Sequence, residues 1–173
     1  MLGKYESFPL NVHFLETFSS NLSIKQLQLK LIEALKDLNR KPFRFEEISI
    51  PTIPNCEVIF EFGIAEEDGF NFLDEQETER ALNALKKIQA ASLDFFCAIR
   101  YYRISGQKKS ALKFDYYMFK ASFVAKKVEF QVFHKQGPRY VSPEELVTIL
   151  IESMNKGSTK RALTKNESEN GEF

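Results

Sequence analysis

Three segments between residues 95 and 133 decide the fold of this chain: FFCAIRYYRI (95–104), FDYYMF (114–119) and VEFQVF (128–133). Aromatic and β-branched residues of this kind suit a pleated, half-buried sheet surface. Short polar stretches separate the segments, with one turn at Gly106 and another near Lys126 and Lys127. The pattern predicts a three-stranded antiparallel β-meander.

Three helices are predicted around this meander, over residues 23–38, 74–91 and 142–154. The clearest start is at Ser142, which is followed by Pro143 at the first helical position and by Glu145, and so forms a capping box. Ser23 predicts the start of the first helix and Asp74 that of the second, because both residue types cap helices well. Apolar residues recur at helical spacing in each segment, which predicts one buried face per helix.

Strands are also predicted at residues 43–50, 56–64 and 70–73, with a weak alternation at 10–14. The order is therefore α-β-β-(β)-α-β-β-β-α, and it predicts an α+β domain whose antiparallel sheet has five or six strands and three helices. This order resembles that of roadblock-type and profilin-like domains. With the strand at 70–73 it is similar to secretion-chaperone-like domains. The resemblance concerns element order over residues 23–154 and implies a fold, not a function.

The composition predicts a single globular domain over residues 1–155 and a disordered polar tail over 156–173. The chain has 173 residues, 43% of them hydrophobic, with 17 Phe and no Trp. Cys56 and Cys97 lack the spacing of a metal or redox pair, so we expect no metal site and no cofactor. No segment has the length and hydrophobicity of a membrane span or a signal peptide, so we expect a cytoplasmic protein with no membrane partner.

Charge is unevenly distributed, although the formal net charge is zero. Residues 1–99 hold 10 basic and 16 acidic residues, whereas residues 100–155 hold 10 basic and 5 acidic residues. Such an asymmetry indicates either a basic binding face or two surfaces that neutralise each other.

The basic half contains the candidate ligand-binding residues, in two groups. The first group lies in the meander, where aromatic rings could stack on bases while cations hold phosphates: Arg100, Tyr102, Arg103, Lys113 and Tyr117. The alternative interpretation is a core face flanked by solvated turns. The second group, His134, Lys135 and Arg139, precedes the last helix. There the sequence favours either an anion site or a plain strand-to-helix connection turned by Gly137.

No catalytic residue is predicted. His13 or His134 could act with Asp115, Glu129 or Glu66 as acid and base, but nothing in the spacing brings them together. We therefore expect a non-enzymatic intracellular binding domain of unknown ligand. The alternatives are a nucleic-acid-binding domain that uses the basic aromatic strands 100–135, and an enzyme of unrecognised type.

Self-association is expected because both faces of the meander carry apolar residues. Phe95 and Cys97 point to one face and Phe96 and Ala98 to the other. If helices cover only one face, a homodimer partner or another protein would cover the second.

Overall fold

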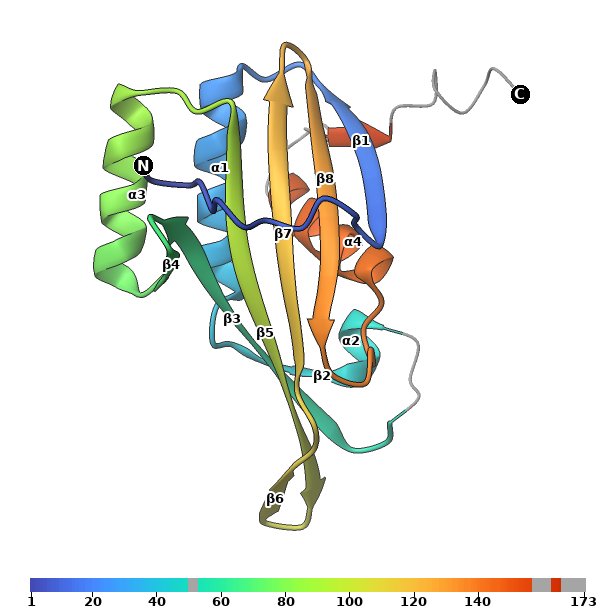
Figure 1. Ribbon diagram of the computed structural model, residues 1–173. Coiled ribbons are helices and arrows are strands. Elements are labelled where there is room, and N and C mark those ends of the chain that lie inside the picture. The colour runs from blue at the N-terminus through green and yellow to red at the C-terminus, as the bar shows by residue number, and fades with distance from the viewer. Residues whose placement is uncertain (50–52, 157–162, 166–173) are drawn as a thin grey trace.

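The computed structural model describes residues 1–49, 53–156 and 163–165 (Figure 1). These residues form an α+β fold with one antiparallel sheet of nine strands and four helices. The strands are β1 (Phe14–Ser20), β2 (Pro42–Arg44), β3 (Cys56–Glu66), β4 (Gly69–Phe72), β5 (Ser92–Ser105), β6 (Lys108–Ala111), β7 (Asp115–Val124), β8 (Lys127–Gln136) and β9 (Leu163–Lys165). The helices are α1 (Ile24–Leu38), α2 (Phe45–Ile48), α3 (Glu75–Lys87) and α4 (Pro143–Asn155).

The predicted meander is confirmed and forms the centre of the sheet. The strand order is β2-β3-β5-β7-β8-β1-β9, with β4 paired to β3 and β6 paired to β5. β5, β7 and β8 are consecutive antiparallel neighbours, as expected. Each is longer than predicted, because the alternation of buried and exposed side chains continues past the aromatic segments.

The predicted helix starts are also confirmed. The Ser23 side chain accepts a hydrogen bond from Gln26 N, and the Ser142 side chain accepts one from Glu145 N in a complete capping box. Asp74 caps α3 by accepting from Glu77 N. These local bonds satisfy backbone donors that the helices themselves leave free.

The sheet is larger than the predicted five or six strands, and there is one helix more than predicted. The strand expected at 43–50 ends at Arg44, because the chain turns into α2 to bury Phe45 completely. The strand expected at 10–14 is displaced, since β1 begins at Phe14 and runs to Ser20. β6 was not predicted, because its sequence KKSA is polar and every residue in it is exposed.

Part of the predicted disordered tail is a strand. Leu163 is 1% exposed, and β9 pairs with the Phe18–Ser20 end of β1. Asn155, at the end of α4, holds it through two hydrogen bonds: Nδ2 donates to Leu163 O at 3.1 Å, and Oδ1 accepts from Leu163 N at 2.8 Å. The rest of the predicted tail after Lys156 lies outside the described residues.

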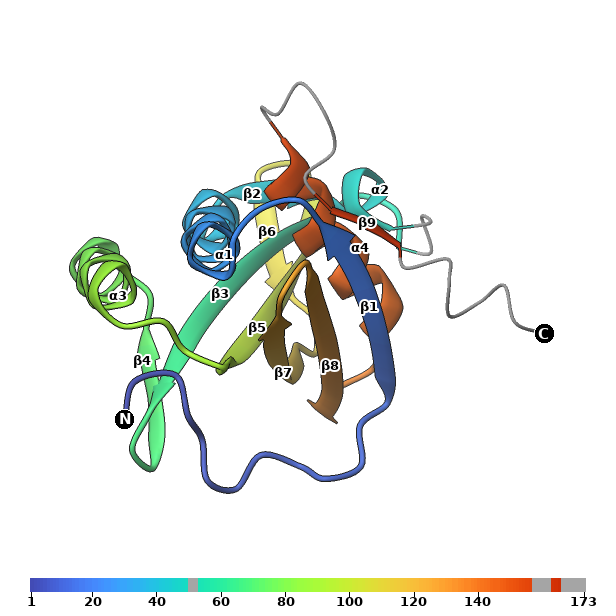
Figure 2. The ribbon, with the colours of Figure 1, turned by 90° about the horizontal axis from the view of Figure 1, so that it is seen from above.

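The helices of the described chain all lie on one side of the sheet, which we call the inner face (Figure 2). The core between them and the sheet is rich in Phe, including Phe60, Phe95, Phe119 and Phe130. Residues 1–13 cross the opposite, outer face in front of β5, β7 and β8 (Figure 1), and we call this segment the strap. In the described residues, no helix has the length and hydrophobicity needed to cross a membrane.

One residue closes a gap in the edge next to β3. β2 pairs with the beginning of β3 and β4 with its end, which leaves Phe60 and Phe62 between them. Asn39 follows α1 and fills this gap. Its Oδ1 accepts from Phe62 N at 3.1 Å and its Nδ2 donates to Leu73 O at 3.0 Å, while Arg40 N donates to Phe60 O at 2.7 Å. This part of the edge therefore does not offer free backbone groups to another strand.

Candidate functional site

The structure places the eight predicted ligand-binding residues in three separate environments. Arg100 and Tyr102 lie half-buried on the outer face of β5. Arg103, Lys113, Lys135 and Arg139 are exposed. Tyr117 is fully buried on the inner face, and the His134 side chain is only 9% exposed. Tyr117 therefore cannot touch a ligand together with Arg100 and Tyr102, because the sheet separates them.

Arg100 and Tyr102 belong to a cluster on the outer face, which we call the outer patch: Phe96, Arg100, Tyr102, Phe114 and Tyr116. The rings of Tyr102 and Phe114 are 5.8 Å apart, and those of Phe96 and Tyr116 are 6.0 Å apart. The Arg100 guanidinium lies 5.9 Å from the Phe114 ring centre and forms an ion pair with Glu61 on β3. All five residues of the patch are half-buried. The patch thus combines aromatic rings with one cation and one neighbouring carboxylate.

The strap covers a different part of the outer face. Asp94 is 1% exposed and forms hydrogen bonds that fix the strap: its Oδ2 accepts from Tyr5 N at 2.8 Å, while its own N donates to Gly3 O at 2.6 Å. Lys120 pairs with Asp94 Oδ1 at 3.2 Å and lies over the ring of Phe8. The strap therefore supplies the cover over this end of β5 and β7.

Two residues of the second predicted group, His134 and Arg139, contact the buried carboxylate of Asp115. Asp115, at the start of β7, is completely buried. Its two oxygens accept hydrogen bonds from Tyr101 Oη at 2.6 Å, Arg139 N at 2.7 Å and Tyr140 N at 2.9 Å. His134 Nε2 lies 2.8 Å from Asp115 Oδ1. Because an ionised carboxylate only accepts, the geometry places the proton of this bond on His134.

This arrangement corrects the expectation that no histidine and carboxylate come together. The loop after β8 does bind an anion, but the anion is the chain's own Asp115, which occupies the backbone donors of Arg139 and Tyr140. The alternation of inward and outward residues along β7 and β8 could have indicated this contact. Asp115 continues the inward row of β7, and His134 continues that of β8, so both were placed to meet inside.

Three buried side chains near Asp115 are held in their protonated forms. Burial raises the pKa of Tyr101, and its hydrogen bond to the Asp115 carboxylate raises it further. Burial likewise raises the pKa of Tyr117, whose hydroxyl donates to Val141 O, and of the Cys97 thiol. All three groups stay protonated at neutral pH. The cluster therefore fixes the β8–α4 connection through bonds to the backbone of Arg139, Tyr140 and Val141.

Gly137 allows the loop to approach this cluster. Its φ is +115°, and a Cβ placed there would lie 2.3 Å from Phe114 O and 2.5 Å from Asp115 Oδ1. A side chain would therefore collide with the backbone and with the carboxylate. The sequence indicated a turn here, and the structure shows the contact that requires glycine.

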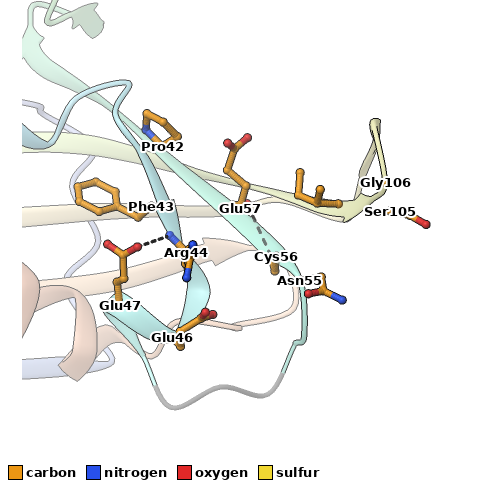
Figure 3. Close-up of a pocket in the computed structure, with 11 residues that line it drawn as sticks. Pro42, Phe43, Arg44, Glu46, Glu47, Asn55, Cys56, Glu57, Ser105 and Gly106 are labelled. Carbon is orange, nitrogen blue, oxygen red and sulfur yellow. Dashed lines mark hydrogen bonds between the residues drawn. The ribbon is translucent and has the colours of Figure 1, made fainter.

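A cleft of about 870 Å³ lies beside α2 (Figure 3). It is lined by β2, α2, the start of β3 and the turn after β5, with Arg44, Glu46, Glu47 and Glu57 among its side chains. Cys56 also lines it, but burial raises the pKa of its thiol, so it is a poor nucleophile. None of the eight predicted residues lines this cleft.

A second cleft of about 330 Å³ lies between β1, β9 and α4. Phe18, Ile151 and Leu163 line it together with polar residues at its rim. Within residues 1–49, 53–156 and 163–165, no three His, Cys, Asp or Glu side chains converge as a metal site requires.

Comparisons with protein-family models, with curated proteins and with solved structures find no match for this chain in any of the three. The likeness in element order to roadblock-type, profilin-like and secretion-chaperone-like domains therefore assigns no family. The functional argument depends on the residues alone.

Proposed function

We propose that this protein is a non-enzymatic binding domain that forms a homodimer through the outer patch. The observation that carries this proposal is the position of the helices. They lie on the inner face, and among the described residues no helix covers the outer patch (Figure 2). The strap is fixed beside the patch, over Asp94 and Lys120, and Phe96 at the edge of the patch packs against Phe70 of β4 with 5.5 Å between the ring centres.

The composition of the outer patch supports a protein partner. Aromatic residues and arginine are enriched at the centres of protein interfaces, where they provide much of the binding energy. Four of the five residues in the patch are aromatic and the fifth is Arg100. Their half-buried rings contact one another, so little side-chain entropy remains to be lost on binding.

Charge within the patch supports a two-fold arrangement. In a two-fold interface the same surface meets itself, so the patch must be complementary to its own copy. Arg100 and Glu61 lie side by side at its edge and form an ion pair within one chain. A two-fold axis that passes beside this pair would bring the Arg100 of one chain towards the Glu61 of the other, which would give a favourable pairing across the interface.

The buried cluster around Asp115 supports binding over catalysis. General acid–base chemistry needs a group that can reach a substrate proton. Asp115 is completely buried and its oxygens are occupied by four donors of the chain itself. A cytoplasmic location forms part of the proposal, because Cys56 and Cys97 are both unpaired thiols.

The test is light scattering after size exclusion, at micromolar protein concentration. The wild type should have a mass of about 40 kDa, twice the 20.1 kDa of one chain. Phe114→Lys places a charge in the outer patch and should give a monomer. Leu15→Lys is the matched control, because Leu15 is 52% exposed on the same face but lies on β1, away from the patch. A monomeric wild type, or equal dissociation of both variants, would overturn the proposal.

A further inference from the structure

The hairpin formed by the end of β5 and by β6 projects from the body of the protein (Figure 1). We call residues 103–113 the arm, which includes the two residues after β6. Arg103 pairs with Ser110 and Ser105 with Lys108, and Gly106 has a φ of +62° in the two-residue turn. β6 pairs with β5 alone, and all four of its residues are exposed.

The arm buries little apolar surface of its own. An isolated two-stranded hairpin is at best marginally stable in water, so burial does not explain why a chain extends one into solvent. The base is fixed by backbone bonds: Ile104 N donates to Asn55 O at 2.7 Å, and Leu112 N donates to Tyr101 O at 2.9 Å. The fold thus presents the arm in a defined direction without covering it.

The charge of the arm is uniform. Residues 100–114 contain five basic residues and no acidic residue. Two of these cations are paired, Arg100 with Glu61 and Lys109 with Glu57. Among the ion pairs formed within the described part of the chain, none involves Arg103, Lys108 or Lys113. These three are therefore available to an external anion.

The shape and side chains of the arm indicate which kind of anion it would bind. The major groove of B-DNA is roughly 12 Å wide and admits a two-stranded β-ribbon. Lysine and arginine bind phosphates, while serine and glutamine can hydrogen-bond to base edges. The arm carries both kinds, with Ser105, Gln107 and Ser110 beside its cations, and all three are exposed.

We infer that the arm is a binding element for double-stranded DNA, with Arg103, Lys108 and Lys113 on the phosphates and the turn directed into the major groove. This inference does not rest on the homodimer, since each chain carries a complete arm. It also relocates the nucleic-acid surface expected from the sequence. Arg103 and Lys113 remain in it, whereas the buried Tyr117 does not.

The test is fluorescence anisotropy with a labelled 20-base-pair duplex at low salt, with the full chain. Wild type should bind saturably, and its affinity should fall steeply with salt. Arg103→Ala combined with Lys108→Ala should weaken binding about tenfold or more. The slope of log affinity against log salt concentration should also become shallower by about 2, because each missing cation leaves one phosphate with its counterions still bound. Both residues are exposed, so the melting temperature should not change.

The matched control is Lys86→Ala combined with Lys87→Ala, which removes two exposed lysines from the end of α3. Its affinity should equal that of the wild type. Absence of binding at tens of micromolar protein, or an equal loss in both double variants, would overturn the inference. So would tighter binding of a single strand of the same sequence, because a ribbon in a groove needs the duplex.

Discussion

His134 Nε2 lies 2.8 Å from Asp115 Oδ1, in a pair that joins β8 to the start of β7. A bulge lies beside this pair, since Tyr117 faces His134 while Tyr116 faces Gln136, which leaves Lys135 as the additional residue. Bulges redirect side chains locally. Here the bulge keeps His134 directed inward while the chain beyond it turns to pass over Asp115.

Asp115→Asn should destabilise the protein, although it is nearly isosteric. An amide has a single acceptor oxygen and adds a donor, so some of the four donors around position 115 would lose their acceptor. We expect a loss of about 1–3 kcal/mol in unfolding free energy for each buried donor left unsatisfied, measured by urea denaturation. Asp37→Asn, on the exposed side of α1, should leave stability unchanged. Equal stability of both variants would show that the cluster is not structural.

Gly137→Ala should be costly for two independent reasons, the positive φ and the collision with Phe114 O and Asp115 Oδ1. We expect a destabilisation of about 2 kcal/mol or more, measured by thermal or urea denaturation. Gly69→Ala serves as the control, because a Cβ there would have no atom within 4 Å. If Gly137→Ala were tolerated as well as Gly69→Ala, the loop could not approach Asp115 as described.

Stability should fall in mild acid because of His13. Its Nδ1 accepts a hydrogen bond from His134 N at 2.8 Å, and its ring stacks on Phe133. His13 is an exposed residue, but partial desolvation of its ring lowers its pKa below the usual 6.5, and the neighbouring Arg139 and His134 lower it further. The unfolded chain therefore binds the proton more readily, so this contribution is complete above pH 6.5 and decreases as the pH falls towards the folded pKa.

The measurement is the unfolding free energy at several pH values between about 5 and 7.5, for wild type and for His13→Asn. Asn retains an acceptor near the position of Nδ1 but does not titrate. The variant should show a shallower decrease in acid than the wild type. Identical pH profiles would contradict this role of His13.

Leu163→Ala should destabilise the domain, because Leu163 is buried where β9 covers the edge of β1. Large-to-small changes at buried leucines cost about 2–5 kcal/mol, and we expect the lower end because β9 is short and at the edge. Thr164→Ala removes an exposed neighbour and should be neutral. The comparison is made by urea denaturation. No difference between the two would show that β9 adds nothing to the stability of the fold.

Local patterns predicted the elements that local chemistry determines. Ser23, Asp74 and Ser142 predicted the helix starts because a cap involves residues only three positions apart. Alternation predicted the central meander and the two faces of β5. Phe45 shows the limit of this reasoning. Its segment alternates like a strand, but burial against the core turned it into a short helix.

Long-range pairing could not be predicted from such patterns. The sequence of β9 is short and polar apart from Leu163, and only its position beside β1 makes it a strand. The strap has only a weak alternation at its end, so its position over the outer face depends on single contacts such as Tyr5 N to Asp94. The same holds for the candidate site. Arg100 and Tyr102 were predicted in one group, but the contribution of Phe114 required the three-dimensional contact.

The pairing of β1 with β8 has a consequence for biosynthesis. Phe14 pairs with Val132 and Phe18 with Val128, so an early strand finds its place only after β8 has left the ribosome. Until then the inward side chains of β1 and the buried face of α1 lack part of their cover. Pairing between segments so distant in sequence is slow, because the chain must lose loop entropy before the contacts form. The nascent chain therefore passes through a period in which chaperone binding competes with aggregation.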